Sequence, residues 1–488
     1  MAPPLSPKRV RAVDAWRLLE IVALVFAGLL LWGFADDIIG LSLRSASWVT
    51  TVLTFAALAI VVRRAPRGIW SPSSVFLIIL ALFHVGLVAS YAFGREPVGE
   101  IGEAAERWIF RDSTLTALWL MDVAMVGYAL GVSLFQYPRQ RREPPSDGEL
   151  AQASLGQLYG AVGSALTIMS VVAWFGIVAS RGGASVLIGS YDSFLEQTRN
   201  SALIYTDRLA YFGLVLMAAA PPSRLRRAAV VAFVIRALFL FPLGQRAEVL
   251  FPTFAALTTL GFRRIPMRAS RAGVLAVVLL AAIAAVRDLR KVGVGEAASS
   301  SVSTSPLDGL AEMGSSLRPV AEVVFWHDLG DPFDGGATYW APFDRSIYYV
   351  IPGWTRPAAE DDDRLMSAVV MKRSGPIGFS IVAEAYRNFA GAGVFIILLG
   401  VGVLLGRIDV WPSDRRSQAA AGMVMTGLLM HIRNAFVPLP AHYLFAFGLL
   451  AVLGWWSRHR IDRARRPASG GRRQAQAAPP TPGRGAGS

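Results

Sequence analysis

The chain of 488 residues contains no cysteine and few charged side chains, and both absences restrict what it can be. Without cysteine, disulfides, thiolate catalysis and cysteine-ligated metal sites are excluded. Charged residues make up 17% of the chain and hydrophobic residues 54%, whereas soluble domains carry roughly a quarter of charged residues. This composition indicates a protein of the lipid bilayer.

Several familiar catalytic and binding motifs are missing too. The five histidines show no HExxH or related zinc spacing, and no P-loop, dinucleotide fingerprint or GxSxG motif occurs. A net charge of +14 would suggest a nucleic-acid partner in a soluble protein. Most arginines instead lie in short connections between apolar runs, so membrane topology explains them better than nucleic acid.

Long apolar runs dominate the sequence. Unbroken runs of this kind are typical of membrane-spanning helices and not of the alternating strands of a porin-type barrel. The sequence therefore predicts an all-α polytopic membrane protein with about 12 transmembrane helices. The predicted helices are about Leu18–Phe34, Trp48–Val62, Ser74–Phe93, Leu115–Phe135, Leu155–Ala179, Leu203–Ala220, Ala228–Leu243, Val249–Phe262, Ala272–Val286, Gly391–Leu405, Ala419–Phe436 and Tyr443–Trp456.

The connections predict the orientation of these helices. Both ends of the chain and every even-numbered connection are basic, and such an arginine bias marks the cytoplasmic side. We therefore expect both termini in the cytoplasm, with residues 458–488 as a disordered basic tail. The basic connections contain Arg63, Arg64, Arg67, Arg139, Arg141, Arg142, Arg224, Arg226, Arg227, Arg263, Arg264, Arg268, Arg271, Arg407, Arg415 and Arg416.

The largest connection, Arg287–Pro376, is predicted to lie outside, between helices nine and ten. It divides the chain into an N-terminal bundle of about nine helices (1–286), an outer loop or cap (287–376) and a C-terminal membrane segment (377–457). A connection of this length in a helical membrane protein is typically functional or disordered. Its aromatic content, with Trp326, Trp340 and Tyr348, favours a partly ordered cap on the outer surface.

Ionisable side chains from separate segments converge at the predicted outer level. Arg208, Arg246, Arg387 and Arg433 all fall there, although arginines are disfavoured on that side. A group of fixed cations suggests an anionic ligand, and the forked guanidinium suits phosphate oxygens. The alternative is that these arginines extend to lipid headgroups or form structural ion pairs with carboxylates such as Asp207, Glu248 and Glu384.

Two acidic clusters are weaker candidates for a metal site. Four adjacent carboxylates occupy Glu360–Asp363, and His327 is followed by Asp328, Asp331 and Asp334. Adjacent carboxylates in a loop are more often solvated than metal-bound. We therefore expect no metal site and no cofactor.

Two stretches carry a resemblance to a known family. PLGQRAEVLFPTFAALTTLG (242–261) resembles the Gly-x-Arg turn and following helix of the Wzy-type O-antigen polymerases, also called oligosaccharide repeat-unit polymerases. GFSIVAEAYRNFAGAGVFIILLGVGVLLGRI (378–408) resembles their Glu-x-Tyr-x-Asn-Phe-Gly pattern and Gly-rich helix. The chain departs from the pattern at Ala390, where glycine is usual, and at Gln245–Arg246–Ala247.

The resemblance implies a GT-C-like glycosyltransferase that joins undecaprenyl-diphosphate-linked oligosaccharide repeats at the outer face of a bacterial inner membrane, without a metal. A flippase and a chain-length regulator are its implied partners, besides the bilayer. Preorganised arginines would stabilise the negative charge of a lipid-diphosphate leaving group. This assigns Arg246 and Arg387 to the diphosphate and Glu384 to the base, with Asp207 as second choice. Further substrate contacts are assigned to Arg433, Arg208, Tyr386, Asn388 and His442.

Three other functions stay open from the sequence. The first is an O-antigen-ligase-like or other lipid-phosphate-sugar glycosyltransferase, in which Asp36 or Asp37 of the first outer loop would be the base. The second is a transporter or flippase of anionic lipid-linked glycans, which would place charges at several depths, whereas only Arg236 lies nearer mid-membrane. The third is a non-enzymatic assembly subunit, which would tolerate loss of Arg246 and Arg387.

Overall fold

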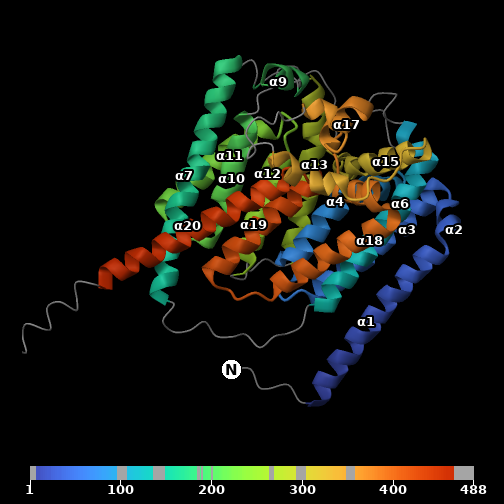
Figure 1. Cartoon of the computed structure of the whole chain (residues 1–488), viewed down its shortest axis with the longest axis horizontal. Coiled ribbons are helices and arrows are strands. Elements are labelled where there is room, and N and C mark those ends of the chain that lie inside the picture. The colour runs from blue at the N-terminus through green and yellow to red at the C-terminus, as the bar shows by residue number, and fades with distance from the viewer. Residues whose placement is uncertain are drawn as a thin grey trace, which may run out of the picture.

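The described residues of the computed structural model form a bundle of helices (Figure 1). These residues are 7–95, 107–135, 149–183, 187, 191–198, 202–262, 269–292, 304–347 and 358–465. Every regular element within these ranges is a helix, and no strand occurs among them. The predicted all-α class is therefore confirmed.

Each of the twelve predicted segments coincides with a helix. The long helices are α1 (Pro7–Gly33), α3 (Leu43–Arg64), α4 (Pro72–Ala92), α6 (Asp112–Phe135), α7 (Glu149–Arg181), α10 (Ala202–Ala219), α11 (Arg224–Leu240), α12 (Ala247–Gly261), α13 (Ala269–Val292), α18 (Ile381–Asp409), α19 (Arg415–His431) and α20 (Leu439–Arg465). Short helices connect them: α2 (Ala35–Ile39), η1 (Gly68–Trp70), η2 (Arg107–Phe110), α9 (Tyr191–Thr198), α14 (Pro306–Met313), η5 (Gly314–Leu317), α15 (Arg318–Asp328), α16 (Ala337–Ile347), η6 (Ala359–Asp361) and α17 (Met366–Ser374).

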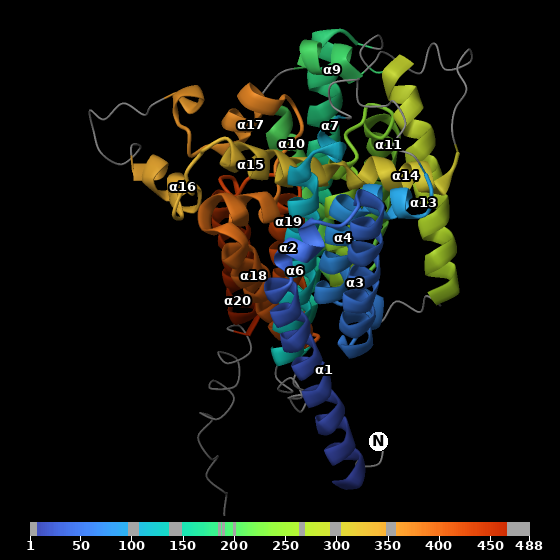
Figure 2. The same cartoon turned by 90° about the vertical axis from the view of Figure 1, so that its right-hand side faces the viewer.

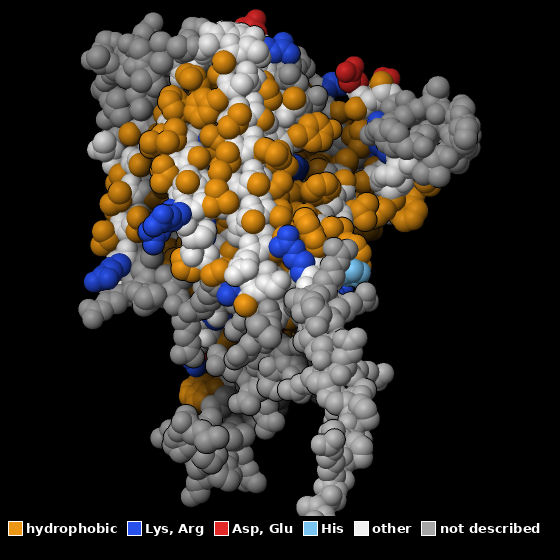
Figure 3. Space-filling model, turned by 90° about the vertical axis from the view of Figure 1, so that its left-hand side faces the viewer, with side chains coloured by type: hydrophobic (Ala, Val, Ile, Leu, Met, Phe, Trp, Pro, Cys, Tyr) orange, Lys and Arg blue, Asp and Glu red, His pale blue; other side chains and the backbone are white. Residues whose placement is uncertain are grey.

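Eight helices of the described chain are long and apolar enough to cross a membrane. Two shorter apolar helices, Ala247–Gly261 and Gly273–Val286, add to them. In the view of Figure 3, hydrophobic side chains cover the middle of the molecule, whereas the Asp and Glu side chains in sight lie at its upper end. A wide apolar surface on a helical bundle is the surface that lipid covers, so the chain is a polytopic membrane protein.

The basic connections gather at one end of the bundle. Arg17 of α1 donates to the carbonyl oxygen of Ser133 at the end of α6, at 3.1 Å. Arg67, after α3, donates to the carbonyl oxygen of Asp409 at the end of α18 at 2.8 Å. Arg415 donates to the carbonyl oxygen of Ala219 at the end of α10 at 2.7 Å. Helices that alternate in direction therefore place their basic ends together, as the sequence pattern predicts.

The large connection lies at the opposite end. In Figure 2, α15, α16 and α17 lie at the upper end of the bundle, whereas α1 begins at the lower end. Ion pairs join the connection to the bundle there, between Arg95 and Asp308 at 2.6 Å and between Arg111 and Glu322 at 3.7 Å. Helices replace much of the loop expected from the sequence.

The first helix of this connection is packed into the bundle instead of lying over it. Gly309 of α14 lies against the backbone of Leu280 in α13, and the backbone of Leu310 lies against Gly86 in α4. The close approach needs hydrogen in place of a side chain on both glycines. Helix α14 is therefore packed against α4 and α13, a contact that sequence periodicity does not reveal.

Gly309→Ala tests this close approach. An added Cβ would overlap the carbonyl oxygen of Leu280, so we expect overpacking to cost about 1–3 kcal/mol and to lower the melting temperature in detergent. The control is Gly273→Ala in α13, where nothing lies within 4 Å of an added Cβ and alanine favours the helix. An equal loss in both variants would contradict the packing of α14 against α13.

Candidate active site

The site is organised around Glu384, a carboxylate that is fully buried in the first part of α18. Ser380 caps this helix, because its Oγ accepts a hydrogen bond from the amide of Ala383 at 3.0 Å. Glu384 Oε1 accepts from the hydroxyl of Thr338 at 2.8 Å. Its Oε2 accepts from the Phe436 amide at 2.7 Å and lies 3.1 Å from His431 Nε2. Three segments far apart in the sequence therefore meet at one carboxylate.

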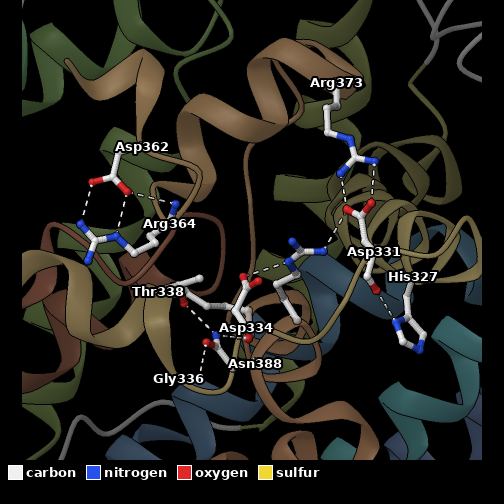
Figure 4. A network of polar contacts seen from close by, with 11 residues as sticks. His327, Asp331, Asp334, Gly336, Thr338, Asp362, Arg364, Arg373 and Asn388 are labelled. Atoms are coloured by element: carbon white, nitrogen blue, oxygen red, sulfur yellow. Dashed lines mark hydrogen bonds and ion pairs between the residues drawn. The ribbon is translucent and has the colours of Figure 1, made fainter. Parts of the chain in front are cut away.

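Asn388, one turn after Glu384, holds the large connection on α18. Its side-chain amide donates to Thr338 Oγ1 at 2.7 Å, and its Oδ1 accepts from the amide of Gly336 at 3.0 Å (Figure 4). The Gly335 amide also donates to the Asn388 carbonyl oxygen at 3.1 Å. The Asn of the Glu-x-Tyr-x-Asn motif is thus bound by the start of α16.

Arg387 lies between two aspartates of the same connection. Its Nε donates to Asp334 Oδ2 at 2.9 Å and its Nη1 to Asp331 Oδ2 at 3.0 Å. Hydrogen bonds from Arg373 above all lower the pKa of Asp331, whereas burial raises the pKa of Asp334. Arg387 and Arg373 thus engage Asp331 and Asp334, two of the three aspartates considered above for a cation. His327 Nδ1 lies 2.8 Å from the Asp331 carbonyl oxygen.

The second acidic cluster is likewise engaged by arginines. Asp362 accepts from Arg345 at 2.6 Å and from Arg364 Nε at 2.9 Å. The hydrogen bonds from Arg364 are the main reason why the pKa of Asp362 falls to about 2. Among the described residues, no group of three or more His, Asp or Glu side chains is placed to hold a metal ion.

A kink directly follows the motif and shows why glycine is usual at the position that Ala390 occupies in this chain. Phe389 and Ala390 interrupt the helical geometry of α18, and Ala390 has φ 55° and ψ −158°. This backbone region is accessible almost only to glycine, and Ala390 is the only non-glycine residue with positive φ among the described residues. Glycine is therefore the expected residue at this position, which supports the alignment of the motif at Glu384, Tyr386 and Asn388.

The end of α19 connects Glu384 with the predicted arginines. Met430 Sδ accepts from the Arg208 guanidinium, and the next residue, His431, contacts Glu384. Arg433 follows the helix, and its carbonyl oxygen accepts from the Phe379 amide at 3.1 Å. The guanidinium of Arg433 lies 6.0 Å from the ring centroid of Phe83 in α4. Glu384 and Arg208 therefore both contact the last turn of α19, and Arg433 directly follows that turn.

Arg246 directly precedes α12, the helix whose Phe251 contacts Phe83. The Phe83 ring packs on Phe251 of α12, with ring centroids 5.5 Å apart. Arg246 is 3% exposed and pairs with Glu312 of α14 through Nη2. Its Nε and Nη1 are buried with no hydrogen-bond partner among the residues that the structure describes. Two unsatisfied donors on a buried cation are costly, and a bound anion would satisfy them.

Asp207 lies in the second turn of α10 and is engaged by a neighbouring helix. It pairs with Arg236 of α11, which is fully buried and also donates to Ser170 Oγ at 2.9 Å. This pair belongs to a second hydrophobic cluster around Trp174 and Phe233, so Asp207 and Arg236 compensate each other's charge within the bundle. Asp207 is therefore less suited than Glu384 to a base at the outer level.

The remaining predicted residues are partly structural. Tyr386 is 8% exposed and packs edge-on against Phe333, with centroids 5.5 Å apart. His442 lies in the first turn of α20, where its Nε2 is 2.8 Å from Thr426 Oγ1 and its ring lies 4.9 Å from that of Phe212.

Asp36 and Asp37 are exposed at the start of α2. Trp326 is buried at 3% exposure, which is unsuited to sugar stacking, and Tyr348 lies outside the described residues.

Thr338 and His431 are the site residues that the sequence did not single out. Thr338 is an ordinary residue of an aromatic-rich connection, and no spacing relates it to Glu384. His431 lies near the end of a predicted helix, and nothing in the sequence relates it to its carboxylate partner, which is 47 residues away. A buried Glu–His pair at a helix end can orient an imidazole and move a proton.

A helical bundle with a buried Glu–His pair and several arginines at one end defines a membrane protein suited to an anionic substrate. The profile of the O-antigen polysaccharide polymerase Wzy family matches residues 19–457, so the chain belongs to this family. It is also 22% identical to Protein CapE of Staphylococcus aureus over 434 residues, 88% of this chain and 93% of that protein. No solved structure matches the chain significantly.

Ala390→Gly tests the kink. Glycine adopts the observed backbone angles without strain, so we expect the variant to gain about 1 kcal/mol of stability and to melt at a higher temperature. The matched control is Ala392→Gly, two residues later in regular helix, which should lose a similar amount. A loss of stability in Ala390→Gly equal to that of the control would show that the helix is not kinked at this position.

Proposed function

We propose that the chain polymerises oligosaccharide repeats linked to undecaprenyl diphosphate, by metal-independent glycosyl transfer. The reaction would take place at the end of the bundle that carries α15–α17. We further infer that this end faces outward from a bacterial inner membrane and that both termini are cytoplasmic, since the opposite end holds the basic connections. The family match supports the polymerase class.

The observation that carries the proposal is a group of three arginines: Arg208 and Arg433 at the end of α19, which holds His431, and Arg246 at the start of α12, which packs against α19. The leaving group is a lipid diphosphate, which gains negative charge as the glycosidic bond to it breaks. Arg208 donates to the Met430 sulfur and lies 5.8 Å from the Tyr211 ring. It forms no salt bridge among the described residues, although Asp207 is near enough to interact with its charge. Arg246 holds two buried donors that have no hydrogen-bond partner in the described part of the chain. Such preorganised donors stabilise developing charge without a metal.

Arg387 supports the site in another way. Asp331 and Asp334 balance its charge, so its contacts favour a role in holding the connection on α18. In that role Arg387 positions Thr338 and the start of α16 beside Glu384. Direct binding of the diphosphate is then assigned to Arg208, Arg246 and Arg433.

The base of the reaction is assigned to Glu384 acting together with His431. Both carboxylate oxygens already accept hydrogen bonds, and the residue is fully buried. The acceptor hydroxyl can instead give its proton to His431 Nδ1, which has no hydrogen-bond partner among the described residues. Glu384 would orient the imidazole and stabilise its protonated form, as carboxylates do in other His-dependent sites.

Arg246→Lys separates anion binding from folding. Lysine keeps the charge that pairs with Glu312 but lacks the Nε and Nη1 donors, so we expect about a hundredfold loss of polymerisation. The measurement is gel analysis of surface polysaccharide in a deletion host that carries the variant. Deletion alone should leave single-repeat glycan in place of a ladder. Arg95→Lys, which changes a partly exposed ion pair at the same end, should restore the ladder. A normal ladder with Arg246→Lys would contradict the role of Arg246.

Glu384→Gln and Asp37→Asn distinguish this mechanism from a ligase-like one. Glutamine removes the negative charge that His431 and the Phe436 amide face, so we expect Glu384→Gln to lose polymer while the protein remains in the membrane. Asp37 is exposed in α2, and its amide variant should retain the ladder. Loss with Asp37→Asn alone would overturn the assignment of the base, and unchanged chain length with missing attachment would indicate a ligase.

A further inference from the structure

Helix α16 has two faces of opposite character. Thr338, Ala341 and Arg345 are buried against the protein. Trp340 is 64% exposed, Phe343 47% and Ile347 43%. Their spacing of three and four residues places these three large apolar side chains on one stripe of the helix. An exposed apolar stripe on a helix outside the membrane spans needs an explanation.

The inner face is fixed by polar contacts. Thr338 donates to Glu384, and Arg345 pairs with Asp362 at 2.6 Å. At the edge of the helix, Asp344 pairs with Arg364 at 2.7 Å. These contacts determine the rotation of α16 about its axis, so the apolar stripe is directed away from the protein by the fold.

The apolar stripe continues an apolar surface of α18. Tyr339 of α16 stacks on Phe389 at the kink, with ring centroids 6.2 Å apart, and Phe389 is 43% exposed. Below the kink, Ile396 is 63% exposed and Leu404 42%, on a helix long and apolar enough to span the membrane. In Figure 2, α16 lies beside the upper end of α18 and projects from the bundle on that side. The surface that lipid covers on α18 therefore leads directly to α16.

We propose that α16 is an interfacial helix whose Trp340, Phe343 and Ile347 side chains insert into the phospholipid leaflet. An amphipathic helix at this level buries its apolar face at the boundary between headgroups and acyl chains, and tryptophan is enriched there. The ion pairs of Asp344 and Arg345 remain on the side of the protein. The occupant of the stripe is bulk phospholipid, because the stripe is continuous with the lipid-facing surface of α18.

This placement relates the bilayer to the site. Thr338, on the inner face of α16, donates to Glu384, so lipid on the outer face would hold the helix against the carboxylate. The headgroup level would then lie within one helix diameter of Glu384. A lipid-linked substrate needs its diphosphate at that level.

The absence of cysteine makes a direct test possible, because a single introduced cysteine is the only labelling site. Phe343→Cys carries an environment-sensitive fluorophore in the full-length protein, reconstituted into phosphatidylcholine and phosphatidylglycerol vesicles. Quenching is measured with phospholipids that carry a nitroxide near the headgroup, and separately with aqueous iodide. Ile396→Cys serves as the lipid-facing control and Lys372→Cys, exposed on α17, as the water-facing control.

We expect the Phe343 probe to be quenched by the nitroxide lipid about as strongly as the Ile396 probe, and by iodide far less than the Lys372 probe. Quenching like that of the Lys372 probe would place the stripe in water and overturn the proposal. Protection from both quenchers would show that protein, such as a second copy of the chain, covers the stripe, and would overturn it equally. The measurement needs no substrate, so its outcome is independent of the polymerase activity.

Discussion

The structure depends on the burial of one carboxylate. Glu384 is fully removed from solvent in a bundle that crosses a membrane, and a buried carboxylate is stable only when donors surround it. Those donors come from α16, from the end of α19 and from the turn that follows it. The same requirement therefore folds the large connection onto α18 and joins the last helices to it.

The positions of the arginines follow from this arrangement. His431 must reach Glu384, which places Met430 against Arg208 on one side and Arg433 above Phe83 on the other. The arginines thus differ in their ion-pair and hydrogen-bond partners, which the sequence alone does not reveal. Arg387 and Arg236 are balanced by aspartates, whereas Arg246 pairs with Glu312 through Nη2 alone and its buried Nε and Nη1 have no hydrogen-bond partner among the described residues.

The fold was largely predictable because helices that span a lipid bilayer need long apolar runs, which are easily recognised in a sequence. Apolar runs such as Ser74–Phe93 agree with α4 to within two residues, since a spanning helix needs a continuous apolar length. The site was predictable only in part. Glu384 and Asn388 belong to a local motif, but their partner Thr338 lies about 50 residues upstream and carries no signal. The burial of α14 could not be predicted either, because only the structure shows that Gly309 and Gly86 allow two backbones to approach each other closely.

The packing of α14 against α4 has a consequence for biosynthesis. Gly86 in α4 meets Leu310 of α14, which the ribosome adds only after the helices from α4 to α13 have been made. Until then, α4 presents an unfilled surface next to α13, and the early helices of the chain cannot complete their packing as they emerge. Membrane insertion of the early helices and completion of their packing are therefore separate in time, and the interval between them lasts at least until α14 has been synthesised.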